Sequence, residues 1–185
     1  MGLLGDWQAD RDRRRRAASY VRSLHQEPDP ADVAWLARFI TDGDNDHAAW
    51  ELRYARRALG FLVAQRDALD DRTPSLIARE LSAALGTDPR VAVGMLALAE
   101  RQLNDRLAAY RTAMAERTGE PQVVRLARVL LQFAGAEDAR AEQIARMAVV
   151  LGRYLEEANA ALREAFGAAS LPEDVAPSEA GPRPA

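Results

Sequence analysis

The residues best suited to bind a metal lie together in one polar segment, and they are Asp42, Asp44, Asp46, His47 and Glu51. The three aspartates alternate as the ligands of a calcium-binding loop do. Such a loop also requires glycine at its sixth position and glutamate at its twelfth, where this sequence has histidine and arginine. His47 and Glu51, four residues apart, would share one face of a helix. The segment therefore predicts either a divalent-metal site or a polar turn in which Asp46 caps the following helix.

A second group of residues that could bind a ligand is a run of arginines near the N-terminus. Its members are Arg11, Arg13, Arg14, Arg15, Arg16 and Arg22. Clustered positive charge binds nucleic acid by releasing the counterions of the phosphates, and a basic amphipathic helix can also bind an anionic membrane. The third interpretation is a solvated helix face that pairs with acidic side chains, because the whole chain is acidic, with a formal net charge of -3.

Two residue types that carry much of protein chemistry are missing, since the sequence contains neither cysteine nor lysine. The lack of cysteine excludes disulfides, thiolate nucleophiles and cysteine-bound metal clusters. The lack of lysine excludes the Walker A phosphate-binding loop and Schiff-base catalysis. The Gly-x-Ser-x-Gly pattern of serine hydrolases and the Glu-x-x-His pattern of di-iron proteins are also absent. The sequence thus favours a non-catalytic protein over an enzyme and predicts no bound cofactor.

The elements that must position these residues are all predicted to be helices, because the apolar residues recur with helical and not strand periodicity. Five of the nine prolines stand at predicted helix starts, where a proline N–H is not needed. The predicted helices cover residues 4–26, 30–41, 46–71, 73–86, 88–118, 121–135 and 138–167. The last three long helices are each expected to start at an aspartate cap, Asp46, Asp88 or Asp138. We expect a basic N-terminal helix (1–27), a helical-hairpin domain (28–171) and a disordered Pro-rich tail (172–185).

The predicted helices after the first alternate between short and long, and this alternation indicates a weak internal repeat. The short helices begin at Pro30, Pro74 and Pro121, which are 44 and 47 residues apart. The pattern Val-x-x-Leu-Ala-Arg at residues 33–38 recurs at 123–128. Each repeat would be one helical hairpin of about 45 residues. The expected fold is therefore all-α, with an N-terminal helix and three hairpins that form a helical bundle or a short α-solenoid.

Two of the long helices carry apolar seams with heptad-like spacing. Their large residues are Leu96, Leu103, Leu107 and Tyr110 in one helix, and Leu151, Leu155 and Leu162 in the other. These seams are candidate interfaces, either with each other or with a second copy of the chain in a homodimer. The helix predicted at 46–71 is apolar around more than half of its circumference, so it should be central.

Further expectations concern packing inside the domain. The helix predicted at 121–135 should be mostly buried, with one narrow polar stripe formed by Arg125, Arg128 and Gln132. A glycine inside a helix is unfavourable by about 1 kcal/mol relative to alanine. We therefore predict close helix crossings at Gly60, Gly94 and Gly152.

The leading functional prediction is a non-catalytic helical interaction or scaffold protein that binds a protein partner. The alternatives are a nucleic-acid-associated accessory subunit, which would use Arg11–Arg16, and a metal-dependent helical enzyme built on the aspartate-rich segment. Abundant alanine and arginine indicate a GC-rich bacterial genome. The sequence has no apolar run long enough for a transmembrane helix, and its first residues do not resemble a secretory signal. We expect a cytoplasmic location.

Overall fold

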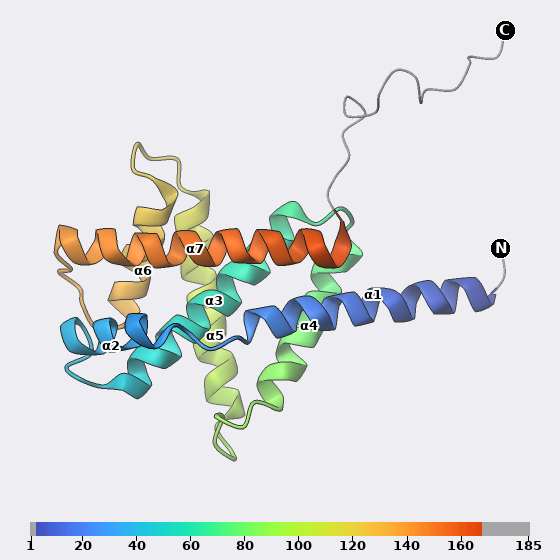
Figure 1. Ribbon diagram of the computed structural model, residues 1–185, viewed down its shortest axis with the longest axis horizontal. Helices are drawn as coiled ribbons and strands as arrows, with labels where there is room; N and C mark the ends of the chain where they lie inside the picture. Colours follow the sequence, from blue (N-terminus) through green and yellow to red (C-terminus); the bar gives the residue numbers. More distant parts are fainter. Residues whose placement is uncertain (1–2, 168–185) are drawn as a thin grey trace, which may run out of the picture.

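Seven α-helices joined by turns make up the computed structural model, which describes residues 3–167, and these residues contain no β-strand. The helices are α1 (Leu3–Leu24), α2 (Pro30–Phe39), α3 (Asn45–Asp67), α4 (Arg72–Gly86), α5 (Leu96–Ala115), α6 (Gln122–Phe133) and α7 (Ala141–Phe166) (Figure 1). The predicted all-α fold is confirmed, as is the alternation of short and long helices after α1. The predicted tail at 172–185 lies outside the described residues.

Helix α3 lies at the centre of the molecule and packs against each of the other six helices (Figure 1). Of its 23 residues, 15 are buried, and they cover nearly its whole circumference. This burial confirms the central position that the sequence predicts for the segment. The apolar residues of α3 form the interior of one continuous core to which all seven helices contribute.

The first and last helices close the bundle around α3, because α1 packs against α4 and α7 while α7 also packs against α3 and α6. The buried face of α1 consists of Ala17, Tyr20, Val21 and Leu24. The Tyr20 hydroxyl donates a hydrogen bond of 2.7 Å to the carbonyl oxygen of Gly60 in α3. A Cβ atom on Gly60 would lie 2.3 Å from Leu24 Cδ2. The prediction of a close helix crossing at Gly60 is confirmed.

The starts of two long helices differ from the prediction. Asp44, and not Asp46, caps α3, since the Asp44 carboxylate accepts the His47 backbone N–H at 2.9 Å. The Thr41 hydroxyl donates to the Asp44 carbonyl oxygen at 2.7 Å and holds the preceding turn. Helix α7 begins three residues after Asp138, and its start is held by the Gln143 side chain, which accepts the Arg140 N–H at 2.8 Å.

The largest error concerns α5, which begins at Leu96 instead of Asp88. The Asp88 carboxylate does not cap a helix, because it is buried and accepts hydrogen bonds from Arg57 and Arg90. The intervening segment contains turns, and Gly94 in it has a left-handed backbone with φ +83°. The predicted helix crossing at Gly94 is therefore wrong. At Gly152 a Cβ atom would find its nearest neighbour at 3.9 Å, so that position has room for a methyl group.

Helix α6 is mostly buried, as predicted, but its expected polar stripe is divided. Arg128 and Gln132 are exposed, whereas Arg125 is buried. The Arg125 guanidinium donates to the carbonyl oxygens of Ala113 and Glu116, at 2.9 Å each, and also to that of Glu120. These carbonyls belong to the C-terminal end of α5 and the turn after it, where helical partners run out. Arg125 thus holds the end of α5 from a neighbouring helix.

Candidate functional site

The aspartate-rich turn does not gather its acidic side chains around one point. Asp42 has a left-handed backbone with φ +51°, Asp44 caps α3, and Asp42, Asp44 and Asp46 are all exposed. The His47 Nε2 lies 3.5 Å from Glu51 Oε1, the one close pair predicted by their spacing. Among residues 3–167 no group of three or more histidine, aspartate or glutamate side chains is arranged to hold a metal ion.

Glu51 is instead bound to an arginine that the sequence analysis did not single out. Its two carboxylate oxygens accept from Arg106 of α5, with 2.9 Å between Arg106 Nε and Glu51 Oε2, and both side chains are buried. The Arg106 guanidinium stacks over the Tyr54 and Phe133 rings, with centroid distances of 5.0 and 4.4 Å. This bidentate ion pair fixes α5 against α3.

A cavity of about 390 Å³ lies beside this ion pair, between α3 and the start of α5, and its walls are both polar and apolar. His47, Trp50 and Glu51 line one side of it, and Gln102 and Arg106 line the other. Glu51 is bound to Arg106, and the Tyr54 hydroxyl donates to Gln102 Oε1 at 3.0 Å. These four polar side chains are therefore already paired within the protein.

Two more buried carboxylates tie distant parts of the chain together. Asp32 of α2 accepts from Arg146 at 2.6 Å and from Arg153, both on α7. Asp88 accepts from Arg57 of α3 at 2.6 Å. Burial alone would raise the pKa of Asp88, but hydrogen bonds from Arg90 and Arg57 outweigh it and hold that pKa at about 2. In the sequence, the one sign of such a pair is a charged residue, such as Arg57, on an otherwise apolar helix.

The residues of the two predicted seams occupy different environments. Leu103, Tyr110, Leu151 and Leu162 are buried among the helices of this chain, and Leu107 and Leu155 are half-buried. Leu96, at the start of α5, is exposed. Helix α5 packs mainly on α3 and α6, and α7 packs mainly on α6 and α3. Each seam therefore faces the centre and the neighbouring short helix.

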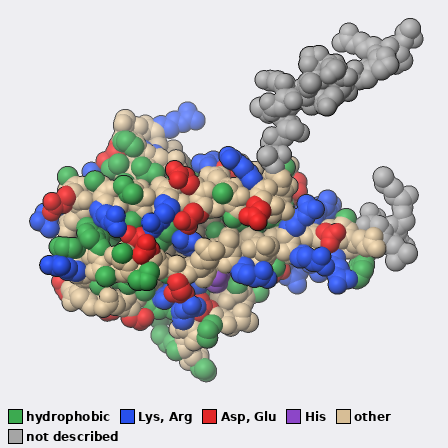
Figure 2. Space-filling view, in the orientation of Figure 1, with side chains coloured by type: hydrophobic (Ala, Val, Ile, Leu, Met, Phe, Trp, Pro, Cys, Tyr) green, Lys and Arg blue, Asp and Glu red, His purple; other side chains and the backbone are tan. Residues whose placement is uncertain are grey.

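The arginine run lies on the exposed part of α1. Arg11, Arg14, Arg15, Arg16 and Arg22 are exposed, and Arg13 is half-buried. Figure 2 shows basic side chains gathered along the end of α1 that extends beyond the rest of the molecule. This geometry keeps their guanidinium groups accessible to a ligand.

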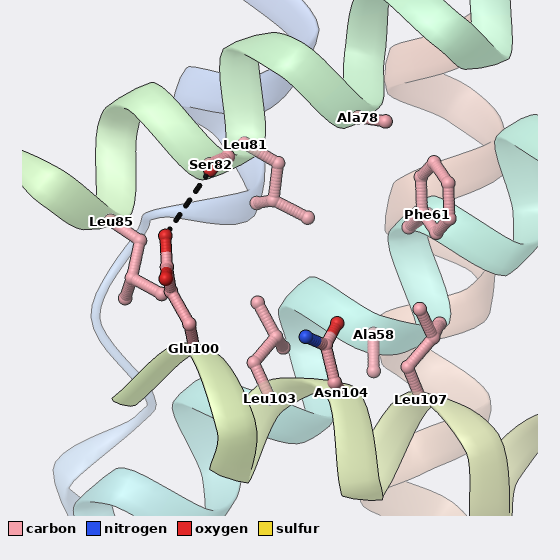
Figure 3. Close-up of a pocket in the computed structure, with 10 residues that line it drawn as sticks. All are labelled: Ala58, Phe61, Ala78, Leu81, Ser82, Leu85, Glu100, Leu103, Asn104 and Leu107. Carbon is pink, nitrogen blue, oxygen red and sulfur yellow. Dashed lines mark hydrogen bonds between the residues drawn. The ribbon is translucent and has the colours of Figure 1, made fainter. Parts of the chain in front are cut away.

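An apolar cleft that the sequence analysis missed lies between α4 and α5 and has a volume of about 300 Å³. Figure 3 shows Leu81 and Leu85 of α4 facing Leu103 and Leu107 of α5 across it, with Phe61 of α3 at one end. The Ser82 hydroxyl donates to Glu100 across one edge at 3.4 Å, and Asn104 is exposed at the rim. The interior of the cleft is therefore apolar and its rim polar.

The turn that joins α4 to α5 adds an exposed apolar surface. Val93 is fully exposed, and Met95 and Leu96 are 45% and 37% exposed. Apolar side chains are visible at the projecting tip below the body of the molecule in Figure 2. Because the chain reverses here instead of continuing α5, these side chains lack helical neighbours to cover them. Contiguous exposed apolar groups of this kind mark interaction surfaces.

Within residues 3–167, no helix combines the length and the apolar character that crossing a membrane requires. Comparison with protein-family models, with curated proteins and with solved structures finds no match. The functional interpretation therefore depends on the geometry and chemistry of the surfaces described above.

Proposed function

We propose that the protein is a non-catalytic helical interaction protein that holds apolar side chains of a partner protein in the cleft between α4 and α5. The observation that carries this proposal is the cleft itself, which is apolar on all three of its helical walls and bordered by polar side chains. Protein interfaces place their strongest contacts in such pockets, where a partner side chain is fully removed from water.

The size of the cleft indicates what the partner inserts. A volume of about 300 Å³ is at the lower end of the range for small-molecule sites, and it suits one or two large aliphatic or aromatic side chains. Side chains three or four residues apart on a partner helix would enter together, as in other helix-in-groove complexes. Burial of each such side chain contributes about 1.5–3 kcal/mol.

The exposed turn extends the binding surface beyond the cleft. A stable protein interface covers about 800 Å² on each partner, which is more than a cleft of this volume can supply. Val93, Met95 and Leu96 lie on the turn between the two helices that form the cleft. Their exposure provides a second apolar contact for the same partner, while Glu100 and Asn104 at the rim supply polar contacts that set its orientation.

The test is to block the cleft without changing the rest of α4. Ala78 lines the cleft, so Ala78→Phe should fill it, and Ser82→Trp should cover its edge. Ala83 on the same helix is exposed and does not line the cleft, and Ala83→Phe is the matched control. A photoreactive side chain introduced at Asn104 in the native cells would link the protein to whatever occupies the cleft.

The expected result is one protein linked at Asn104 that is lost with both blocking variants and kept with the control. Circular dichroism and thermal unfolding would verify that each variant remains folded. The proposal is wrong if the linked protein persists when the cleft is filled, or if no protein is linked at all. A small apolar molecule recovered in its place would also contradict it.

A further inference from the structure

The N-terminal half of α1 forms an arm that extends past the ends of α4 and α7 (Figure 1). The helix has 22 residues and is therefore about 33 Å long. Only its C-terminal half contributes to the core, through Ala17, Tyr20, Val21 and Leu24. Residues 7–12 and 14–16 are exposed, and most of the arginine run lies among them.

Helix α1 is charged oppositely to the rest of the protein. Its residues 3–24 contain six arginines and three aspartates, a net charge of +3. Since the formal net charge of the whole chain is -3, the remaining residues carry -6. Such separation of charge creates a local positive potential in a protein that is acidic as a whole.

The arginines of α1 are weakly paired, in contrast to those of the core. Asp10 lies 3.5 Å from Arg14 and 4.0 Å from Arg13, and Asp12 lies 4.0 Å from Arg15, all with exposed side chains. Exposed pairs within one helix contribute at most about 0.5 kcal/mol. An anionic ligand can therefore displace them. Among residues 7–167, no carboxylate lies within ion-pair distance of Arg11, Arg16 or Arg22.

A second helix brings another arginine to the same place. Arg72, the first residue of α4, lines a broad hollow together with Arg11, Arg13 and Arg14 of α1. Asp10 and Trp7 also line it. Trp7 is 61% exposed, and the Arg11 guanidinium lies 5.6 Å from its ring centroid. Four arginines that line one hollow beside an exposed aromatic ring match the chemistry of phosphates linked to stackable bases.

The burial of α1 distinguishes between the two polyanions that its arginines could attract, an anionic membrane surface and a nucleic acid. A helix that binds a membrane surface must insert a free apolar face below the headgroups. The apolar residues in the C-terminal half of α1, Tyr20, Val21 and Leu24, are already packed against α4 and α7. Residues 7–16 contain one large apolar side chain, that of Trp7, which is too little for an inserting face. Electrostatic contact with phosphates remains open to the arm, and a helix of this diameter fits the major groove of a duplex.

We infer that α1, together with Arg72, binds the phosphate backbone of nucleic acid. The contacts are made by guanidinium groups to phosphates, which fix position without reading sequence. This second binding surface is independent of the cleft between α4 and α5. A protein with both surfaces would bring a protein partner to a nucleic acid.

The test uses the full-length protein and a fluorescently labelled 30-base-pair DNA duplex, with anisotropy measured from 50 to 200 mM NaCl. The variant replaces Arg11, Arg13 and Arg14 with glutamine. The matched control replaces Arg38, Arg101 and Arg117, which are exposed and lie elsewhere in the chain, so that both proteins lose the same charge. Thermal unfolding would establish that both remain folded.

The expected result is binding by the unmodified and control proteins that weakens with salt, and at least tenfold weaker binding by the α1 variant at 50 mM NaCl. The slope of log Kd against log salt should fall by about 0.9 for each phosphate contact that the variant loses. Three outcomes would overturn the inference. These are no binding by the unmodified protein, equal weakening in the two variants, and binding to vesicles of phosphatidylglycerol and phosphatidylcholine but not to the duplex.

Discussion

At the scale of single residues, three glycines with the same sequence context have three different roles. All three interrupt segments with helical periodicity. Gly60 permits the contact of α1 with α3, Gly94 adopts a left-handed turn, and at Gly152 a Cβ atom would meet its nearest neighbour at an ordinary contact distance. The difference arises from what lies opposite each residue, and this is a property of the folded molecule.

Gly60→Ala should lower the free energy of unfolding by about 1–2 kcal/mol, because the new methyl group would collide with the buried Leu24 side chain. The cost of this overpacking is larger than the stability that alanine adds through its higher helix propensity. Gly152→Ala should raise it by up to about 1 kcal/mol, since that position lacks a close neighbour. Urea unfolding of the two variants measures both effects. A stabilised Gly60→Ala protein would mean that Leu24 can move aside.

His25 should make the protein less stable in mild acid. Its side chain is partly buried near Arg57, Asp88, Arg90 and Glu27, and its Nε2 is buried without a hydrogen-bond partner. Burial, followed by the positive charge of Arg57, lowers its pKa to about 4. The unfolded chain has a histidine pKa near 6.5, so below this pH the unfolded state binds more protons.

The contribution of His25 is therefore fully present above pH 6.5 and is lost as the pH falls toward 4. Replacement of His25 by Gln should reduce the loss of unfolding free energy between pH 7 and pH 5. The other histidine, His47, is half-buried, and His47→Gln provides the matched control. Equal pH profiles for the unmodified protein and the His25 variant would refute this assignment.

At the scale of elements, arginines join neighbouring helices to one another. Arg125 of α6 reaches the last carbonyls of α5, and Arg106 of α5 reaches Glu51 of α3. Helix α2 is tied to α7 by Asp32. Helices α2 and α6 also share a burial pattern, since the leucine and alanine of Val-x-x-Leu-Ala-Arg are buried in both and the arginine is exposed. That agreement supports the repeat that the sequence indicates.

Arg125→Met should loosen the end of α5 more than it changes the core, because its aliphatic part remains while three carbonyls lose a charged donor. Hydrogen exchange should accelerate by tenfold or more at residues 112–120. Arg128→Met, on the same helix, removes an exposed ion pair with Glu120 and should leave exchange unchanged within about twofold. Similar exchange in the two variants would argue against the capping role.

At the scale of the whole molecule, the central helix holds the bundle together with charged as well as apolar groups. Glu51, Arg56 and Arg57 of α3 are buried, and they bond to α5, to Glu157 of α7 and to the turn before α5. The Arg57–Asp88 pair is the most deeply buried of these. It anchors the irregular segment that carries the exposed apolar turn.

Arg57→Met should destabilise the protein by about 3–5 kcal/mol, because it leaves the buried Asp88 carboxylate without its closest partner. Arg66→Met on the same helix breaks an exposed pair with Asp67 and should change stability by less than about 1 kcal/mol. Chemical denaturation followed by circular dichroism compares the two. A small effect of Arg57→Met would show that Arg90 alone is sufficient to satisfy Asp88.

The sequence by itself determined the number and order of the helices, the alternation of short and long helices after the first, and also which helix is central. These properties depend on local rules, namely apolar periodicity, proline at helix starts and the burial of a helix that is apolar all round. The prediction for α2 shows this, since Pro30 begins the helix and Asp29 accepts the Ala31 N–H at 2.8 Å.

The tertiary structure alone decided the start of α5, the role of each buried charge and the positions of the cleft and the arm. Asp88 has the same local sequence as a helix cap, and only its contact with Arg57, 31 residues away, gives it a different role. Asp32 and Arg153 are 121 residues apart. The free energy of such pairs depends on the burial created by other helices, and no local pattern encodes that burial.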